Sequence, residues 1–426
     1  MAAKRFTVDG TSVGVIDEDE TGNQKTVTPP PVPADQSGLT VNTSVRSDGV
    51  EVDGTEALIT EAEERPRVQT WILYRGRRRT PWREAESWCG LRCIGYIYIP
   101  MRIESKCAMS WEFKKIADGF ALTEGPVWDG DGLIFSDFPS DRILQIDHIT
   151  CEWTTIRTGT NGANGLKYGP DGHLYGCEGK GPRRVVRYEE DGRVTVVADE
   201  YEGKRLNAPN DLVIDGEGRI WFTDPNYPVH DEGFDFDYGA VYRADPVGDN
   251  EWNLKQVIDD TEKPNGILLS PDKSTLYVAE THHKWGRGNR ELRAYTVHDD
   301  GSVGDFEVLH NFFPHRSIDG MCLDEEGNIV ATAGGENNGP GPMIYVFAPN
   351  GRVLETHPFP ADQPTNCAFG GPDLRTLYVT NFEQAGDEDQ FDKTTASLHR
   401  AKTDRSGLLG APDNDLERTA LHNERK

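Results

Sequence analysis

From Trp111 onward, the chain consists of short stretches in which apolar and polar residues alternate, separated by turn-forming dipeptides. Alternation with a period of two predicts half-buried β-strands. The Asp-Gly, Asn-Gly and Pro-Asp pairs between these stretches are typical of hairpin turns. We therefore predict an all-β fold for this part of the chain.

Aligning the turns reveals a strand-turn-strand repeat that occurs six times. The copies begin at Glu124, Asn164, Asn210, Asn265, Asp319 and Asn366. Their starting positions differ by 40, 46, 55, 54 and 47 residues, a period typical of four-stranded propeller blades rather than of helical or leucine-rich repeats. Further apolar stretches, such as residues 184–188 and 194–197, supply the outer hairpin of each blade. The pattern predicts a six-bladed β-propeller.

Closing such a ring without an open sheet edge usually requires an N-terminal strand to complete the last blade. Residues 111–117 are the natural candidate for this strand. Large aromatic residues recur at equivalent positions of the repeat, and we interpret them as packing between blades rather than as a stacking site for bases or sugars. They are Trp128, Tyr175, Trp221, Tyr277 and Tyr378.

The first 108 residues differ from the repeats in composition. Residues 1–64 hold 4 Lys/Arg and 13 Asp/Glu, a proline-rich run at 28–33 and no sustained periodicity, which predicts disorder. Residues 65–106 reverse to 10 basic and 3 acidic residues. We interpret residues 1–108 as a mostly disordered extension; the alternatives are a basic patch or targeting element, or a reading frame extended upstream of a start at Met101 or Met109. The propeller is expected at residues 109–405 and a polar tail at 406–426.

Charge and cysteine content narrow the function classes. The 426 residues include 72 acidic and 45 basic ones, giving a net charge of −27, which repels phosphate backbones and disfavours nucleic-acid binding. No apolar run is long enough to cross a bilayer, and the N-terminus lacks a secretory signal, so we expect a cytoplasmic protein without membrane contact. Seven irregularly spaced cysteines predict buried free thiols rather than disulfides.

The residue that opens each copy always carries a side-chain oxygen. Because the first strand of a propeller blade runs along the central channel, the six residues are expected to converge on one axis. Turn chemistry explains a single Asn or Asp before Gly, but six copies out of six favour a shared site. Glu124 and Asp319 with neighbouring amides form a hard oxygen cage that suits Ca²⁺, with Mg²⁺ or Mn²⁺ as alternatives and Zn²⁺ less suited, because no His or Cys shares the ring.

Several of these segments, in this order, resemble the family of gluconolactonases, senescence marker protein (regucalcin) and luciferin-regenerating enzyme. They are residues 124–128, 209–211, 264–266, 318–323 and 366–370, and the resemblance covers about residues 111 to 403. It implies a single divalent metal held by Glu124, Asn210, Asn265 and Asp319. It also implies that Asp319 is the catalytic general base. The regucalcin-type branch has an Arg two residues before the third-blade Asn, where this chain has Ala208, so that substrate contact is not implied here.

The activity that the resemblance implies is hydrolysis of a sugar lactone, with the metal polarising the carbonyl and Asp319 activating water. Candidate substrate-binding residues are Asn164, Glu178, Arg183, Arg205 and His283; for Asn164 and Glu178 a role in turn or rim hydrogen bonding is the alternative, and for His283 simple solvation. No G-x-S-x-G sequence occurs within residues 109–405, which disfavours a serine esterase. Hydrolysis of other esters or phosphotriesters, and a non-catalytic propeller with a structural metal, stay open.

Overall fold

The computed structural model describes residues 110–227, 233–282, 288–336, 338–384 and 394–408, together with six short strands between residues 4 and 72. The chain divides into two compact units, Met1–Arg102 and Ile103–Lys426. In the described part of the chain, no helix is long and apolar enough to cross a membrane.

The first unit contains one hairpin and one four-stranded antiparallel sheet. Its strands are β1 (Lys4–Val8), β2 (Thr11–Ile16), β3 (Val41–Arg46), β4 (Gly49–Val52), β5 (Thr55–Ile59) and β6 (Thr70–Ile72). β1 pairs with β2, and the sheet has the order β3-β4-β5-β6. Each strand contains Val or Thr, β-branched residues that favour extended backbone.

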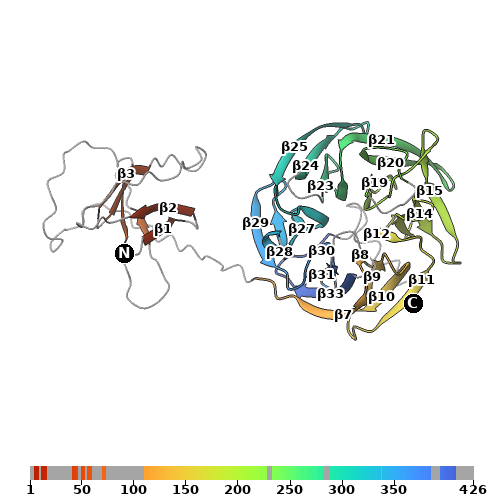
Figure 1. Ribbon diagram of the computed structural model, residues 1–426, viewed down its shortest axis with the longest axis horizontal. Coiled ribbons are helices and arrows are strands. Elements are labelled where there is room, and N and C mark those ends of the chain that lie inside the picture. Colours follow the sequence, from red (N-terminus) through yellow and green to blue (C-terminus); the bar gives the residue numbers. More distant parts are fainter. Residues whose placement is uncertain are drawn as a thin grey trace. The chain divides into compact units, whose positions relative to one another are not determined.

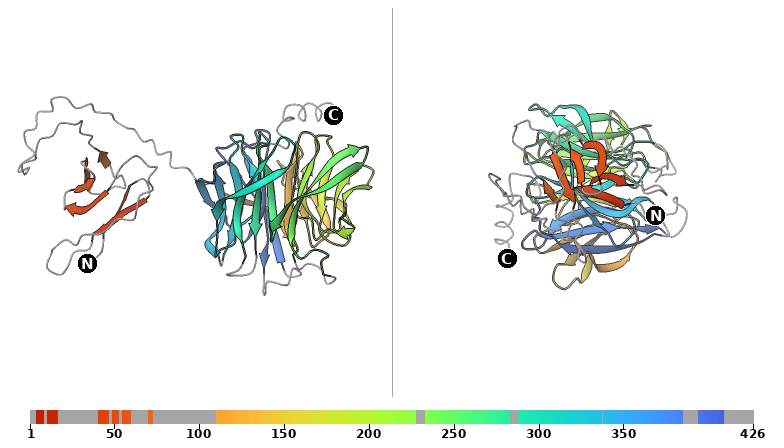
Figure 2. Two further views of the ribbon diagram at one scale, coloured as in Figure 1. Left: turned by 90° about the horizontal axis from the view of Figure 1, so that it is seen from above. Right: turned by 90° about the vertical axis from the view of Figure 1, so that its left-hand side faces the viewer.

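The second unit is a ring of six antiparallel sheets (Figure 1), and its strands run broadly along the ring axis in the side view (Figure 2). Blade one consists of β8 (Thr123–Trp128), β9 (Gly132–Asp137), β10 (Arg142–Asp147) and β11 (Trp153–Thr158). Blade two consists of β12 (Ala163–Tyr168), β13 (Leu174–Glu178), β14 (Arg184–Tyr188) and β15 (Val194–Ala198). Blade three consists of β18 (Leu212–Ile214), β19 (Ile220–Asp224), β20 (Gly239–Gly248) and β21 (Glu251–Thr261).

The remaining three blades follow the same plan. Blade four consists of β22 (Pro264–Leu269), β23 (Thr275–Thr281), β24 (Arg290–Val297) and β25 (Val303–Asn311). Blade five consists of β26 (Ile318–Leu323), β27 (Ile329–Gly335), β28 (Asn338–Phe347) and β29 (Val353–Pro358). Blade six consists of β30 (Pro364–Gly370), β31 (Thr376–Asn381), β33 (Thr394–Lys402) and β7 (Lys114–Phe120). Three short strands lie between or beside the blades: β16 (Glu200–Tyr201), β17 (Lys204–Arg205) and β32 (Glu383–Gln384).

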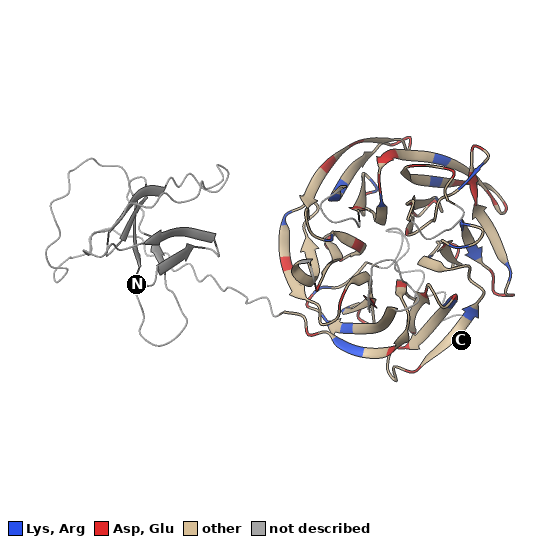
Figure 3. Ribbon diagram, viewed as in Figure 1, with Lys and Arg blue, Asp and Glu red and all other residues tan. Residues whose placement is uncertain are grey.

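The first strands of the blades form a closed inner ring. β8 contacts β12, β12 contacts β18, and the sequence of neighbours continues through β22, β26 and β30 back to β8. Charged residues of both signs are spread over the blades (Figure 3). The predicted six-bladed propeller is confirmed.

An N-terminal strand closes the ring, as predicted. β7 pairs antiparallel with β33, from Phe120 opposite Ala396 to Lys114 opposite Arg400, so blade six combines strands from both ends of the propeller. The strand begins three residues after the expected start. Trp111 instead stacks on the ring of His357, with the two ring centroids 3.9 Å apart.

The core lies between the blades, and the recurring aromatic residues are part of it. Trp221 of blade three packs in one cluster with Ile267 and Leu269 of blade four, and Trp128 of blade one packs with Tyr378 of blade six. Burying one such side chain contributes about 1.5–3 kcal/mol. The interpretation of these residues as packing between blades is confirmed.

Free thiols are also found as predicted within the described residues. Cys151, Cys177, Cys322 and Cys367 are all free, and Cys177 and Cys367 are buried.

Candidate functional site

The residue that opens each repeat lies where the first strand of a blade leaves regular pairing. In five blades, the pairing register between the first and second strands shifts at this point. In blade three, Asn210 precedes β18 altogether. A bulge of this kind re-aims a side chain that would otherwise alternate with the strand. In these five blades, the local backbone therefore departs from regular strand geometry at the polar residue.

Glycine follows the opening residue in four of the six copies because adjacent inner strands approach closely. A Cβ on Gly266 would lie 2.5 Å from the carbonyl oxygen of Asp319. A Cβ on Gly125 would lie 2.2 Å from the carbonyl oxygen of Asn164. These contacts are too short for any side chain, so glycine allows neighbouring blades to bring their opening residues together.

Glu124 and Asp319, the two predicted carboxylate ligands, are both buried and act on each other electrostatically. Burial raises the pKa of Glu124 well above its ordinary value, and the negative charges of Asp319 and Asp211 raise it further. The Glu124 carboxylate accepts a hydrogen bond from its neighbour Gly125 N–H at 3.0 Å and another from the side chain of Asn366. Like charges held together in this way favour binding of a proton or a cation.

Unlike Glu124, Asp319 is paired with an arginine side chain. Burial raises the pKa of Asp319 to about 6, while the guanidinium of Arg316 and a hydrogen bond from Asn265 act in the opposite direction. Arg316 donates from Nη2 to Oδ2 of Asp319, and its Nη1 donates to the carbonyl oxygens of Gly334 at 2.9 Å and Pro364 at 3.1 Å. The arginine therefore anchors this carboxylate to blades five and six.

Asn265 connects Asp319 to a tyrosine. Its side chain hydrogen-bonds Asp319, and its Nδ2 donates to the hydroxyl oxygen of Tyr227 at 3.1 Å. Burial and the charge of Asp319 raise the pKa of Tyr227, so this hydroxyl stays protonated at neutral pH.

A third buried carboxylate, Asp211, was not predicted as a site residue. It occupies the position where four other copies carry glycine, and its Oδ2 lies 3.5 Å from Nδ2 of Asn366, which acts as the donor. Burial raises the pKa of Asp211, and the cation of Lys167 on β12 counteracts this effect. The departure from glycine in Pro209-Asn-Asp211 is the one sequence signal that would have identified this residue.

The donor set fits a divalent cation that prefers oxygen ligands. Besides the carboxylates, Asn164 presents an Oδ1 atom that is buried without a hydrogen-bond partner in the described part of the chain. Asn210 is also buried, and no described residue pairs with its side chain. Carboxylate and amide oxygens suit Ca²⁺, Mg²⁺ or Mn²⁺, whereas Zn²⁺ prefers His and Cys. Across the described ranges, no group of three or more His, Cys, Asp or Glu side chains is arranged to hold a metal, so a cation here would depend on the asparagines.

Glu178 lies apart from the ring of opening residues, in a second series of polar residues at the ends of the second strands. Its Oε2 accepts from Nε of Arg184 at 2.7 Å and from Nδ2 of Asn161 at 3.0 Å. The equivalent residue of blade three, Asp224, accepts the backbone N–H groups of Asn207 and Ala208, both at 2.8 Å. These carboxylates hold the loops that lead into the inner strands, which favours the rim hydrogen-bonding role for Glu178.

The two arginines predicted to contact substrate lie in loops of blades two and three. Arg183 is buried, donates to the carbonyl oxygen of Gly233 at 2.9 Å and lies over the ring of Phe234. Arg205 is exposed on β17 and donates to the carbonyl oxygen of Gly181 at 2.6 Å. His283 lies outside the described residues. The structure thus brings together Glu124, Asn265 and Asp319 through direct interactions and places Arg183 and Arg205 in other contacts.

The fold and this site define a six-bladed β-propeller with carboxylates and amides gathered where its inner strands begin. A family profile described as "SMP-30/Gluconolactonase/LRE-like region" matches residues 122–383. The chain therefore belongs to the SMP-30/gluconolactonase/LRE-like family, as the sequence motifs indicated.

Individual relatives agree with this assignment. The chain is 31% identical to a gluconolactonase of Zymomonas mobilis over 66% of its own length and 81% of that protein. It is 27% identical to the diisopropyl-fluorophosphatase of Loligo vulgaris over 64% of its length and 89% of that protein. Among solved structures, a gluconolactonase of Xanthomonas campestris superimposes with a TM-score of 0.57 and 27% identity, covering 69% of this chain and 90% of that one.

Proposed function

We propose that the protein is a divalent-metal-dependent hydrolase that opens a sugar lactone. The observation that carries the proposal is the gathering of buried Glu124, Asp211 and Asp319, with raised pKa values, beside the unpaired Oδ1 of Asn164. Such a group of like charges is costly without a cation. The similarity to two gluconolactonases supports the lactone as substrate.

Glu124, Asn210, Asn265 and Asp319 would hold the cation, and Ca²⁺ fits this donor set best. When bound, a divalent cation polarises the lactone carbonyl and stabilises the oxyanion that forms when water attacks. The side chain of Asp319 accepts the proton of that water, because Arg316 and Asn265 hold the carboxylate in place. The Tyr227 hydroxyl, held by Asn265, is positioned near Asp319 to orient the substrate.

A second candidate is hydrolysis of phosphotriesters or phosphofluoridates. The similarity to a diisopropyl-fluorophosphatase over most of the propeller favours it. The same carboxylates and amides would serve this reaction, since it also needs a polarised oxygen and an attacking oxygen nucleophile.

The deciding experiment uses metal-stripped full-length protein. Hydrolysis of glucono-1,5-lactone, of a panel of other lactones and of a fluorophosphate is measured before and after each divalent cation is added back. Lactone opening that returns with one cation supports the leading proposal. Restoration only of the fluorophosphate reaction supports the second candidate, and metal binding without any hydrolysis supports a propeller with a structural metal.

A further inference from the structure

Blade five lacks a carboxylate that other blades use to hold their entering loop. The residues at the equivalent position near the end of the second strand are Asp137, Glu178, Asp224, Glu280, Ala333 and Asn381, in blade order. Asp137, Asp224 and Glu280 each accept two backbone N–H groups of the loop that enters the inner strand. Ala333 has no group that can do so.

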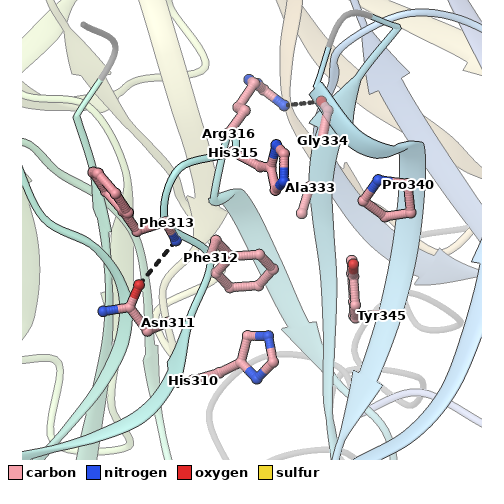
Figure 4. Close-up of a pocket in the computed structure, with 10 residues that line it drawn as sticks. All are labelled: His310, Asn311, Phe312, Phe313, His315, Arg316, Ala333, Gly334, Pro340 and Tyr345. Atoms are coloured by element: carbon pink, nitrogen blue, oxygen red, sulfur yellow. Dashed lines mark hydrogen bonds between the residues drawn. The ribbon is translucent and has the colours of Figure 1, made fainter. Parts of the chain in front are cut away.

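A cavity of about 190 Å³ lies at this place, bounded by the loop before β26 and by β27 and β28 (Figure 4). Phe312 and Tyr345 form aromatic walls with their rings at 89° to one another. His315 and Arg316 line the cavity as well, beside Ala333. Its volume is below the roughly 300–1,000 Å³ of most ligand pockets, so it suits a small molecule or one substituent of a larger one.

The guanidinium of Arg316 is buried, with 8% of its residue surface exposed, and it is only partly paired. Three of its five N–H groups donate, to Gly334, Pro364 and Asp319. For the other two, the described residues provide no acceptor. In blades one, three and four, a carboxylate of the second strand accepts from the loop that enters the inner strand. In blade five, Ala333 occupies that position and lines the cavity.

The formal charge of the centre supports the same conclusion. Three carboxylates, Glu124, Asp211 and Asp319, face two cations, Lys167 and Arg316, which leaves one negative charge. A divalent cation held by these residues changes this to one positive charge. The centre then attracts an anion, and the unpaired N–H groups of Arg316 are donors that suit an oxyanion.

We propose that the blade-five cavity is an oxyanion-binding subsite in which Arg316 receives a phosphate, sulfonate or carboxylate group. Because Arg316 also contacts Asp319, an oxyanion there lies next to the proposed catalytic carboxylate. The group is either a substituent of the substrate or a free anion. Only the first of these sources rests on the proposed lactonase function.

The binding test uses inorganic phosphate titrated into the full-length protein by calorimetry, with and without Ca²⁺. Ala333→Asp restores the carboxylate that blades one and three carry, so it should pair with Arg316 and weaken phosphate binding by about tenfold or more. The matched control Ala333→Asn has the same size without the charge and should weaken binding by less than about threefold. No phosphate binding to the wild type, unchanged binding in Ala333→Asp, or equal weakening by Asp and Asn would overturn the proposal.

A second variant covers the case in which Ala333→Asp does not fold. Arg316→Gln keeps most of the side-chain length and removes the charge, so phosphate affinity should fall by about tenfold or more. Phosphate binding that requires Ca²⁺ and survives Arg316→Gln would place the anion on the metal and contradict the subsite.

The source of the anion is found with a matched pair of substrates, glucono-1,5-lactone and its 6-phosphate. If the oxyanion belongs to the substrate, kcat/KM is about tenfold higher for the phosphorylated lactone, and Ala333→Asp removes this preference. If the subsite takes a free anion, the two lactones react equally and added phosphate binds in the absence of lactone. Intact phosphate binding without hydrolysis of any lactone contradicts the proposed function but supports the subsite.

Discussion

Arg316 donates from Nη2 to Oδ2 of Asp319, and both side chains are buried. A cation of the protein itself therefore already stabilises the charged form of the proposed catalytic carboxylate. Arg316 is itself held by hydrogen bonds to two backbone carbonyl oxygens. Its guanidinium is therefore fixed in position and keeps Asp319 in one orientation.

This pair predicts how Arg316→Gln affects the titration of Asp319. Arg316 lowers the pKa of Asp319 against the effect of burial, so its removal should raise that pKa above about 6 in metal-free protein. Protons then compete with Ca²⁺ up to higher pH, and the pH at which Ca²⁺ affinity is half-maximal should shift upward. Carboxyl ¹³C NMR of metal-free protein and Ca²⁺ titrations between pH 5 and 9 measure both effects. A downward shift of either value would contradict the assigned role of Arg316.

Removing either carboxylate ligand should weaken metal binding while the two variants differ in metal-free stability. Glu124→Gln and Asp319→Asn each delete one anionic ligand, so Ca²⁺ affinity should fall by about tenfold or more. Without metal, Glu124→Gln relieves repulsion and should melt at the same temperature as the wild type or higher. Asp319→Asn leaves buried Arg316 without its anion and should destabilise the fold, by about 3–5 kcal/mol.

Calorimetric Ca²⁺ titration and thermal unfolding with and without chelator separate these effects. Asp191→Asn, in an exposed turn, is the control and should change neither quantity. Wild-type Ca²⁺ affinity in both ligand variants would show that the metal does not bind at Glu124 and Asp319.

Much of the architecture could be read from the sequence because it repeats. Six turns and six polar opening residues recur with a blade-sized period, and this was enough to predict the ring, the closing strand and the packing role of residues such as Trp221. The strand β7 was placed within three residues, since pairing with β33 depends on alternation that is visible locally.

The missed site residues lie where contacts between blades, rather than the repeat itself, decide the chemistry. Asp211 replaces a glycine, Lys167 stands where the other copies carry apolar residues, and Arg316 belongs to a loop of no fixed pattern. Their proximity to Glu124 and Asp319 results from the bulges of the inner strands and from the close approach of neighbouring blades. A single sequence shows neither feature.

Two buried carboxylates outside the metal site predict a pH dependence of stability. Burial raises the pKa values of Asp224 and Glu280 to about 7, above the roughly 4 expected in an unfolded chain. Between about pH 4 and 7, the folded protein therefore holds protons that the unfolded chain has released. The contribution of each group to the free energy of unfolding is largest below about pH 4 and falls by up to about 1.4 kcal/mol per pH unit as the pH rises to 7.

Asp224→Asn and Glu280→Gln should each remove one such contribution. The measurement is the free energy of unfolding from urea titrations at pH 4 to 8, compared between wild type and variant. The wild type should lose stability relative to each variant as the pH rises through this window and show no further relative loss above about pH 8. A relative gain over the same window would mean that these carboxylates are ionised in the folded protein.

The closing strand gives a prediction about where the chain can be shortened. β7 supplies the fourth strand of blade six, and Trp111 just before it is buried against His357 and donates from Nε1 to Asp404 at 3.2 Å. Deleting residues 1–108 leaves this strand and its anchor intact, so the melting temperature of the propeller should change by only a few degrees. Deleting residues 1–120 removes the strand, exposes the edge of β33 and opens the ring, so the product should aggregate or melt at a much lower temperature.

Size-exclusion chromatography and thermal unfolding of the two truncated proteins distinguish these outcomes. Equal stability of both would show that the ring closes without β7, and loss of folding already at residue 108 would show that the first unit is needed by the propeller.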